Sequence, residues 1–370
     1  MAIIDNLKIK HLEDLVFMHG VAGVKEAMAH LLEITRDSSN VRLKWDGAYQ
    51  LFWGREHAGG PVIVATISAW QDGSKPTCKE ELYEYMTHHS GFIKSAQPFE
   101  SKIESASELS NNFSVFVEAM PDDFVGFIYC DVLFTKKPPL EKTRFKITPN
   151  NRTYYTVPRK SKLGMHINKA KIMLAAHGIL PNYGEDTTEL IIHNDFSAFN
   201  TKKMVVLDPI YAKEPLKPID DELANLMAFV DTHAETLDGF LAPIACMPKF
   251  KSEIYNYTCR KAIQKRLYWL GDDFLVWCEE SKISNIQIRA IKARMAKYPQ
   301  GLVIMTRIMK YIIILKNHII NQLEIKFESG MRVYISEGWI RVGDKTKQFG
   351  DIKLVLRHKW KPRLQYYEAG

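Results

Sequence analysis

A change of pattern part-way along the chain constrains the fold more than any other feature. Residues 218–322 carry apolar side chains at helical spacing almost throughout, whereas the segments on either side contain short runs of β-branched and aromatic residues. Strands and helices that are segregated along a chain in this way are typical of the α+β class. We therefore expect a core of antiparallel sheets with flanking helices, which an all-helical block interrupts and later strands complete.

This pattern divides the chain into four segments. Residues 1–39 form an N-terminal helical segment, residues 40–217 the first part of the core, residues 218–322 the helical insertion, and residues 323–370 the strands that complete the core. We expect helices near residues 10–36, 77–88, 165–177, 219–240, 251–268, 271–281, 284–297 and 301–322. We expect extended segments over residues 41–54, 60–70, 111–120, 125–134, 188–193, 323–327, 331–336, 338–343 and 352–356.

The most apolar stretch of the chain predicts a buried helix and not a membrane span. Residues 301–321 contain Arg307, Lys310 and Lys316, so the stretch never reaches the roughly 18 uncharged residues that a span needs. Asp5 lies where a signal peptide would be apolar, and the five cysteines include no C-x-x-C pair. We expect reduced thiols, no membrane partner and a cytoplasmic protein, in the host cytoplasm if a phage encodes it.

The positive charge of the chain is concentrated in two segments. The formal net charge is +7, but residues 136–171 hold eleven lysines and arginines against one glutamate, and residues 341–370 hold eight against three acidic residues. Like charges at this density repel one another unless a polyanion offsets them, so we expect a nucleic acid partner. An ordinary solvated loop is the alternative. The basic residues expected at this interface are Lys136, Lys137, Lys142, Arg144, Lys146, Arg152, Arg159, Lys160 and Lys162.

The quartet Lys44-Trp45-Asp46-Gly47 is the sharpest motif in the chain. By itself the K-x-D-G pattern fixes only three positions, and a lysine at the end of a strand before an Asp-Gly turn is the ordinary alternative. Its position in the sequence favours a functional role, because an extended segment precedes it, another follows it, and Gly47 permits a tight turn close to a ligand.

With this motif the sequence resembles the covalent nucleotidyltransferases, which are the ATP-dependent DNA and RNA ligases and the mRNA capping enzymes. The resemblance implies that Lys44 attacks the α-phosphate of ATP and carries AMP as a covalent adduct. It also implies that Asp46, Gly47 and Arg55 contact the nucleotide, with Arg55 near the phosphates.

The next two motifs of the resemblance concern the ribose and the base. Glu118, which we expect at the end of a strand, is the candidate carboxylate for the ribose hydroxyl. Phe127 and Tyr129 are alternative platforms for stacking on the base, in a segment that resembles FYxFD but has cysteine at position 130. Asp131 is a second acidic candidate for the nucleotide or for a metal ion.

The last two motifs of the resemblance lie near the C-terminus. Glu337, in a Glu-Gly pair, is the expected metal ligand, and Lys353 is the expected α-phosphate ligand. Lys347, in Lys345-Thr346-Lys347, is an alternative to Lys353. A second placement of both motifs, at Glu189 and Lys202-Lys203, lacks the glycine.

The resemblance is nearest to the phage RNA ligases, since only 17 residues follow Lys353 and we expect no OB-fold domain there. It implies an ATP-dependent polynucleotide ligase that forms lysyl-AMP, passes AMP to a 5′-phosphate and joins that end to a 3′-hydroxyl. The cofactors would be ATP and Mg²⁺ or Mn²⁺, and the substrate single-stranded or nicked RNA or DNA. The alternatives are an enzyme that only caps or adenylylates ends, and a non-catalytic nucleic-acid-binding protein on the same fold.

Overall fold

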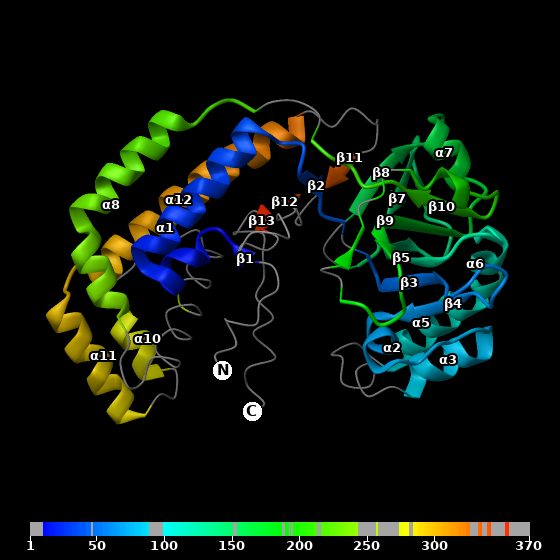
Figure 1. Cartoon of the computed structure of the whole chain (residues 1–370), viewed down its shortest axis with the longest axis horizontal. Helices are drawn as coiled ribbons and strands as arrows, with labels where there is room; N and C mark the ends of the chain where they lie inside the picture. The colour runs from blue at the N-terminus through cyan, green and yellow to red at the C-terminus, as the bar shows by residue number, and fades with distance from the viewer. Residues whose placement is uncertain are drawn as a thin grey trace. The chain divides into compact units, whose positions relative to one another are not determined.

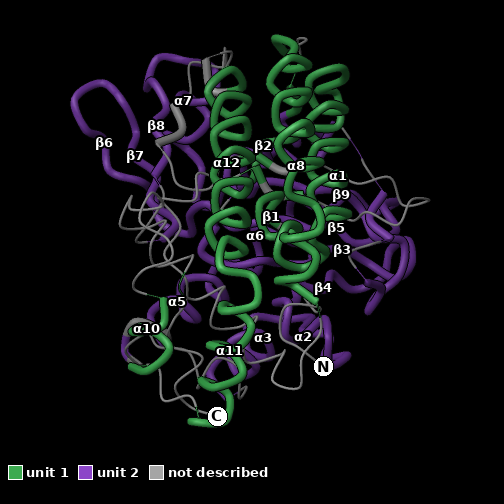
Figure 2. The backbone as a smooth tube through the Cα atoms, turned by 90° about the vertical axis from the view of Figure 1, so that its left-hand side faces the viewer, with its two compact units in different colours: residues 1–44, 211–326, 336–370 green, residues 45–210, 327–335 purple. Residues whose placement is uncertain are grey.

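The computed structural model shows a protein of helices and β-sheets, of the α+β class (Figure 1). Among the residues that the structure describes, the strands form three sheets, and two of these join strands from distant parts of the chain. The protein has two compact units (Figure 2). Unit 1 comprises residues 1–44, 211–326 and 336–370, and unit 2 comprises residues 45–210 and 327–335. The structure describes residues 10–45, 47–88, 99–150, 154–186, 189–191, 193, 195–212, 216–242, 257, 274–280, 284–325, 332–334, 339–341 and 352–354.

Three long helices of unit 1 pack against one another: α1 (Asp14–Arg36), α8 (Asp220–Leu241) and α12 (Gly301–Ile325). Helix α1 is kinked at Gly20, which has a φ of 59°, and Val21 N there donates to Asp238 Oδ1 of α8 at 2.8 Å. Two shorter helices, α10 (Phe274–Glu280) and α11 (Asn285–Lys297), follow α8 along the chain.

Helix α12 is the buried helix that the sequence predicts at its most apolar stretch. Lys316 Nζ, which interrupts that stretch, lies 2.7 Å from both carboxylate oxygens of Glu13, and both side chains are fully buried. In the part of the chain that the structure describes, no helix is long and apolar enough to cross a membrane.

Unit 1 also contains a small sheet that joins the two ends of the chain. Its strands are β1 (Lys10–His11), β2 (Val41–Leu43), β12 (Trp339–Arg341) and β13 (Ile352–Leu354), in the order β1-β13-β12-β2. Strand β12 is antiparallel to both of its neighbours, whereas β1 and β13 are parallel. The C-terminal strands therefore return to the strand that precedes Lys44.

The centre of unit 2 is a five-stranded sheet in the order β10-β9-β5-β3-β4. One face packs on α3, α5 and α6 through residues such as Trp53, Leu109 and Phe116, and the other packs Phe52 and Phe127 on Trp70 of α2. Its strands are β3 (Gln50–Arg55), β4 (Ile63–Thr66), β5 (Gly126–Phe134), β9 (Ile172–Leu180) and β10 (Met204–Leu207). The helices are α2 (Ile67–Asp72), α3 (Lys79–His88), α5 (Phe99–Asn111) and α6 (Phe113–Ala119).

A second sheet of unit 2 carries much of the basic segment. Its order is β11-β8-β7-β6, and Phe145, Ile147, Tyr155 and Val157 are buried on one face. The strands are β6 (Leu140–Glu141), β7 (Arg144–Ile147), β8 (Tyr154–Pro158) and β11 (Arg332–Tyr334). Helix α7 (Lys162–Ile167) and the short 3₁₀ helix η3 (Ser197–Phe199) complete the unit.

Several predicted elements are wrong. Residues 113–119 are helical, because Phe113, Phe116 and Ala119 recur at a spacing of three and face the sheet core. The predicted helix over residues 165–177 ends at Ile167 and gives way to β9. The extended run over residues 60–70 becomes helical at Ile67, after Thr66 caps α2 through its side chain.

Three further differences concern boundaries. Helix α12 extends through Ile325 into the segment predicted as strand, and residue 191 makes only an isolated bridge with Ile179. The N-terminal helix and strands β12 and β13 belong to the unit that contains the helical block, so the predicted division at residues 39, 217 and 322 differs from the compact units. Of the helix predicted over residues 251–268, only Tyr257 lies within the described residues.

Candidate functional site

The register of the small sheet in unit 1 brings three of the predicted motifs to neighbouring strands. Leu43, the residue before Lys44, pairs with Trp339, and Glu337-Gly338 immediately precede Trp339 in the sequence. Ile340 on the same strand pairs with Lys353 of β13. The end of β2 and the start of β12 lie at the same end of an antiparallel ladder. Segments that are about 300 residues apart in the sequence are therefore adjacent.

In unit 2 the glycine of the motif lies against strand β5. Ala48 N donates to Val132 O at 2.8 Å, and Val132 N donates to Tyr49 O at 2.8 Å. A Cβ atom added to Gly47 would lie 2.7 Å from Val132 O and 2.8 Å from Asp131 Cβ. Only glycine fits this approach without a shift of the strand. Gly47 and Ala48 are thus fixed beside Asp131 and Val132.

Asp131 is a buried carboxylate with a defined partner. It is 4% exposed, and its Oδ2 lies 2.9 Å from Nε2 of His177 on β9. Because an ionised carboxylate only accepts hydrogen bonds, Nε2 is the donor. The ring of Tyr129, two residues before Asp131, lies 4.8 Å from the His177 ring. A carboxylate, an imidazole and a phenol therefore meet on one face of the central sheet.

A row of aromatic rings continues from this group across the sheet. Tyr129 stacks on Phe52 at 4.9 Å, and Phe52 stacks on Trp70 at 4.1 Å. Phe127 is fully buried against Trp70, whereas Tyr129 is only partly buried. Of the two predicted platforms, Tyr129 is the one with surface left to contact a base. Cys130 points to the opposite core, where burial raises the pKa of its thiol.

Arg55 is held at the far end of strand β3 from Asp131. Gln50 pairs with Asp131, whereas Arg55 pairs with Gly126, so five residues of strand, about 17 Å, separate the two ends. The buried guanidinium donates to Met120 O at 3.3 Å and lies 3.2 Å from Asp122 Oδ1. The structure therefore gives Arg55 a role in anchoring this end of the sheet and does not bring it to Gly47 or Asp131.

Glu118 lies in the last turn of helix α6 and not at the end of a strand. Its Oε2 accepts from Lys203 Nζ at 2.6 Å, and both side chains are about half exposed. The alternative motif residue Glu189 is also exposed. In the part of unit 2 that the structure describes, Asp131 is thus the predicted acidic residue that is buried and next to the motif glycine.

The basic residues of the second sheet alternate with its buried residues. Arg144 donates to the hydroxyl and carbonyl of Thr156. Lys146 Nζ lies 3.0 Å from Glu141 Oε1 and 5.4 Å from the centre of the Tyr154 ring. Tyr154 is 36% exposed. This face of the sheet therefore presents an aromatic ring with a cation beside it.

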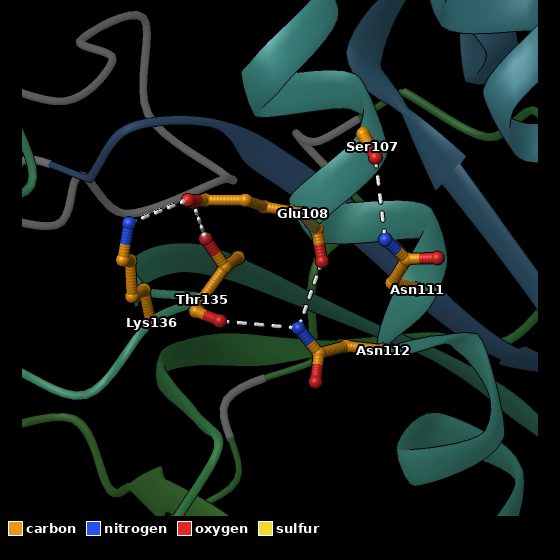
Figure 3. Close-up of polar contacts among 6 residues, drawn as sticks. All are labelled: Ser107, Glu108, Asn111, Asn112, Thr135 and Lys136. Atoms are coloured by element: carbon orange, nitrogen blue, oxygen red, sulfur yellow. Dashed lines mark hydrogen bonds and ion pairs between the residues drawn. The ribbon is translucent and has the colours of Figure 1, made fainter.

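The two lysines at the end of β5 have neighbours of their own. Figure 3 shows Thr135 and Lys136 beside the Glu108 carboxylate. Lys136 Nζ lies 3.7 Å from Glu108 Oε1, and the Thr135 hydroxyl donates to Glu108 Oε2 at 3.0 Å. Asn112 Nδ2 donates to the carbonyls of Glu108 and Thr135, which ties α5 to β5. Lys137 donates to Asn168 at 3.1 Å.

Some of the other predicted site residues are exposed in the structure, and others lie outside the described residues. Lys142 occupies a turn with a φ of 56°. Lys142, Arg159, Lys160 and Lys162 are exposed. Arg152, Asp46, Glu337, Lys345 and Lys347 lie outside the described residues, and of Lys353 only the strand position is described.

A metal site is not formed by the described residues alone. Among them, no three or more His, Cys, Asp or Glu side chains are grouped closely enough to hold a metal ion. Sequence reasoning missed His177 and Trp70, which a strand and a helix bring to the Asp131 face. His177 lies inside the apolar run IMLAAHGIL. A polar residue in such a run is expected to be buried and hydrogen-bonded to another polar group, and this pattern could have identified it.

Comparison with known proteins gives a family and no activity. No curated protein and no solved structure matches the chain. One protein family matches residues 6–266, a range that includes Lys44, Asp131 and His177 and covers more than half of the chain. The chain therefore belongs to this family, which is described as "Family of unknown function (DUF6267)".

Proposed function

We propose that this protein is a covalent nucleotidyltransferase of the polynucleotide-ligase type, with Lys44 as the nucleophile. The observation that carries the proposal is the register of the small sheet in unit 1. Local sequence patterns do not dictate that the strand before Lys44 pairs with the strand after Glu337-Gly338, or that Lys353 lies on the next strand. The three motifs of the resemblance need this adjacency in order to act on one phosphate.

Lys44 would act as an amine nucleophile. A lysine attacks only through the lone pair of its neutral form. Its Nζ would form a bond to the α-phosphorus of ATP, the bond from that phosphorus to the bridging oxygen would break, and pyrophosphate would leave with that electron pair. One proton is lost from the nitrogen. Positive charge beside the phosphate lowers the barrier to such a transfer, and Lys353 is the residue we assign to it.

Unit 2, taken by itself, offers side chains of the kinds that bind a nucleoside. Tyr129 has a partly exposed ring for stacking on the base. Asp131 takes the ribose role that the resemblance gives to an acidic residue, in place of Glu118, because Asp131 lies against Gly47 and Glu118 is paired with Lys203. We assign the metal ligand role to Glu337 and assay with Mg²⁺, since a triphosphate offers the hard oxygen ligands that this ion prefers.

The second sheet of unit 2 would bind the polynucleotide. Lys146 beside the exposed Tyr154 ring, together with exposed Lys160 and Lys162, combines phosphate contacts with a surface for stacking on a base. The ligase would then pass AMP from Lys44 to a 5′-phosphate and join that end to a 3′-hydroxyl with release of AMP.

The test is incubation of the full chain with α-labelled ATP and Mg²⁺, followed by denaturing electrophoresis. We expect a labelled band at the mass of the protein, present in the exposed-lysine control Lys25→Ala and absent in Lys44→Ala. Absence of a band with both ATP and GTP would refute the proposal. Adding a 5′-phosphorylated single strand separates the alternatives. An adenylylated strand without joined product indicates an end-modifying enzyme, and salt-sensitive binding without any adduct indicates a binding protein.

A further inference from the structure

Asp131 and His177 form a buried pair, and the proposed function gives a role to Asp131 but none to His177. The Oδ2–Nε2 distance is 2.9 Å, and the residues are 4% and 8% exposed. Burial of two polar side chains costs free energy unless they are hydrogen-bonded to each other. Val132 and Cys130, on the other face of β5, lie in an ordinary apolar core. The pair is thus a specific polar feature of the Tyr129 face.

The backbone of β9 is irregular at this point. Opposite β5, Cys130 pairs with Ala176 but Tyr129 pairs with Gly178, so His177 is an extra residue in the ladder. A bulge of this kind changes the direction of a side chain locally. Here the imidazole of the extra residue reaches the Asp131 carboxylate and contacts the Tyr129 ring at 4.8 Å. The irregular strand therefore serves the contact between His177 and Asp131.

The contact restricts what Asp131 can do. A carboxylate has two oxygens with about four acceptor positions, and His177 engages Oδ2. A fixed carboxylate next to a stacking ring fits a polar hydroxyl of a bound nucleoside. The motif turn packs closely beside this residue, since a Cβ atom added to Gly47 would lie 2.8 Å from the Asp131 Cβ.

We infer that His177 is a positioning residue that holds Asp131 in place to accept a hydrogen bond from the ribose of a nucleoside triphosphate. The inference rests on the proposed function for the identity of the ligand. It assigns to His177 a part in the preference for ribose over deoxyribose, through Asp131 and without direct contact between His177 and the nucleotide. Loss of the Nε2 donor would leave Asp131 free to turn away from the hydroxyl.

Two variants separate the donor from the ring. His177→Gln keeps an N–H donor at nearly the same reach, whereas His177→Phe keeps a ring against Tyr129 and loses the donor. Equilibrium binding of ATP and of 2′-deoxy-ATP is measured by calorimetry on the full chain without Mg²⁺, so that AMP transfer to Lys44 does not follow binding. We expect His177→Phe to weaken ATP binding about 10-fold while leaving deoxy-ATP binding nearly unchanged, and His177→Gln to behave as the wild type.

Folding of the variants is checked by thermal melting. If His177→Phe does not fold, His177→Asn replaces it. The asparagine side chain is one methylene shorter than that of glutamine, so we expect it to lose the hydrogen bond to Asp131. Equal ATP and deoxy-ATP binding by the wild type and by the variant without the donor would overturn the inference, as would equal losses in the Gln and Phe variants.

The outcome is distinguishable from failure of the proposed function. If the wild type binds ATP but forms no lysyl adduct, the covalent chemistry is refuted. The role of His177 is then still tested by the nucleotide affinities of the wild type and the variants. Wild-type protein that binds neither nucleotide overturns both. A loss of adduct formation in Lys44→Ala, together with unchanged ATP preference in the variant without the donor, overturns only the role of His177.

Discussion

Substitution of Gly47 by alanine tests the geometry beside Lys44. A Cβ at this position would lie 2.7 Å from Val132 O, 2.8 Å from Asp131 Cβ and 2.9 Å from Val132 N. Two of these atoms are backbone atoms of the central strand β5, so the turn must move instead. Overpacking of this kind costs about 1–3 kcal/mol. A shift of about 1 Å in a reacting group lowers a rate by roughly 100-fold.

The assay measures both consequences. We expect Gly47→Ala to lower the urea midpoint of unfolding and to slow formation of the labelled adduct by about 100-fold. Gly59→Ala is the control for adduct formation alone: a Cβ there would meet nothing within 4 Å, but its φ of 70° disfavours alanine, so its urea midpoint should fall as well. Wild-type stability and adduct formation in Gly47→Ala would refute the reasoning.

Three further predictions concern the rest of the chain. Glu13→Gln removes the carboxylate that faces the buried Lys316 ammonium and should lower the free energy of unfolding by about 3–5 kcal/mol. The double variant Glu13→Leu with Lys316→Met should lose far less stability, and urea titration of both variants tests the difference. Tyr154→Ala should weaken binding of a labelled single strand several-fold in fluorescence anisotropy and leave adduct formation unchanged. Hydrogen bonds from Thr77 lower the pKa of Glu81 below its usual 4.5, so the wild type should exceed Glu81→Gln in melting temperature above that pH and lose the difference on acidification.

Local pattern predicted the elements whose residue spacing agrees with their final structure. The apolar and aromatic run of β5, the extended segments that contain β3 and β4, and the amphipathic helices α8 and α11 all agree with the sequence expectations. Residues 113–119 did not, because Phe113, Val115 and Phe116 have strand propensity, and contact with the sheet core decides in favour of a helix. Propensity is a weak guide where tertiary burial opposes it.

Of the candidate site, too, only a part could be predicted from the sequence. The return of strand pattern after residue 322 led to the expectation that these strands complete the core. Strand β12 does pair with β2 next to Lys44, but both belong to the compact unit that contains the helical block. The choice of Asp131 over Glu118 needed the backbone approach of Gly47, which depends on the pairing of the chain after Lys44 with β5. His177 could not be placed from sequence, because its direction follows from one extra residue in a strand ladder.

The site of nucleotide attachment is the most direct test of the central claim. After incubation with ATP and Mg²⁺, the intact protein is measured by mass spectrometry and its acid-sensitive adduct is localised on peptides. We expect a gain of a single adenylyl group, carried by the peptide that contains Lys44 and missing in Lys44→Ala. Modification of another lysine, or an unchanged mass in the presence of ATP and of GTP, would contradict the account.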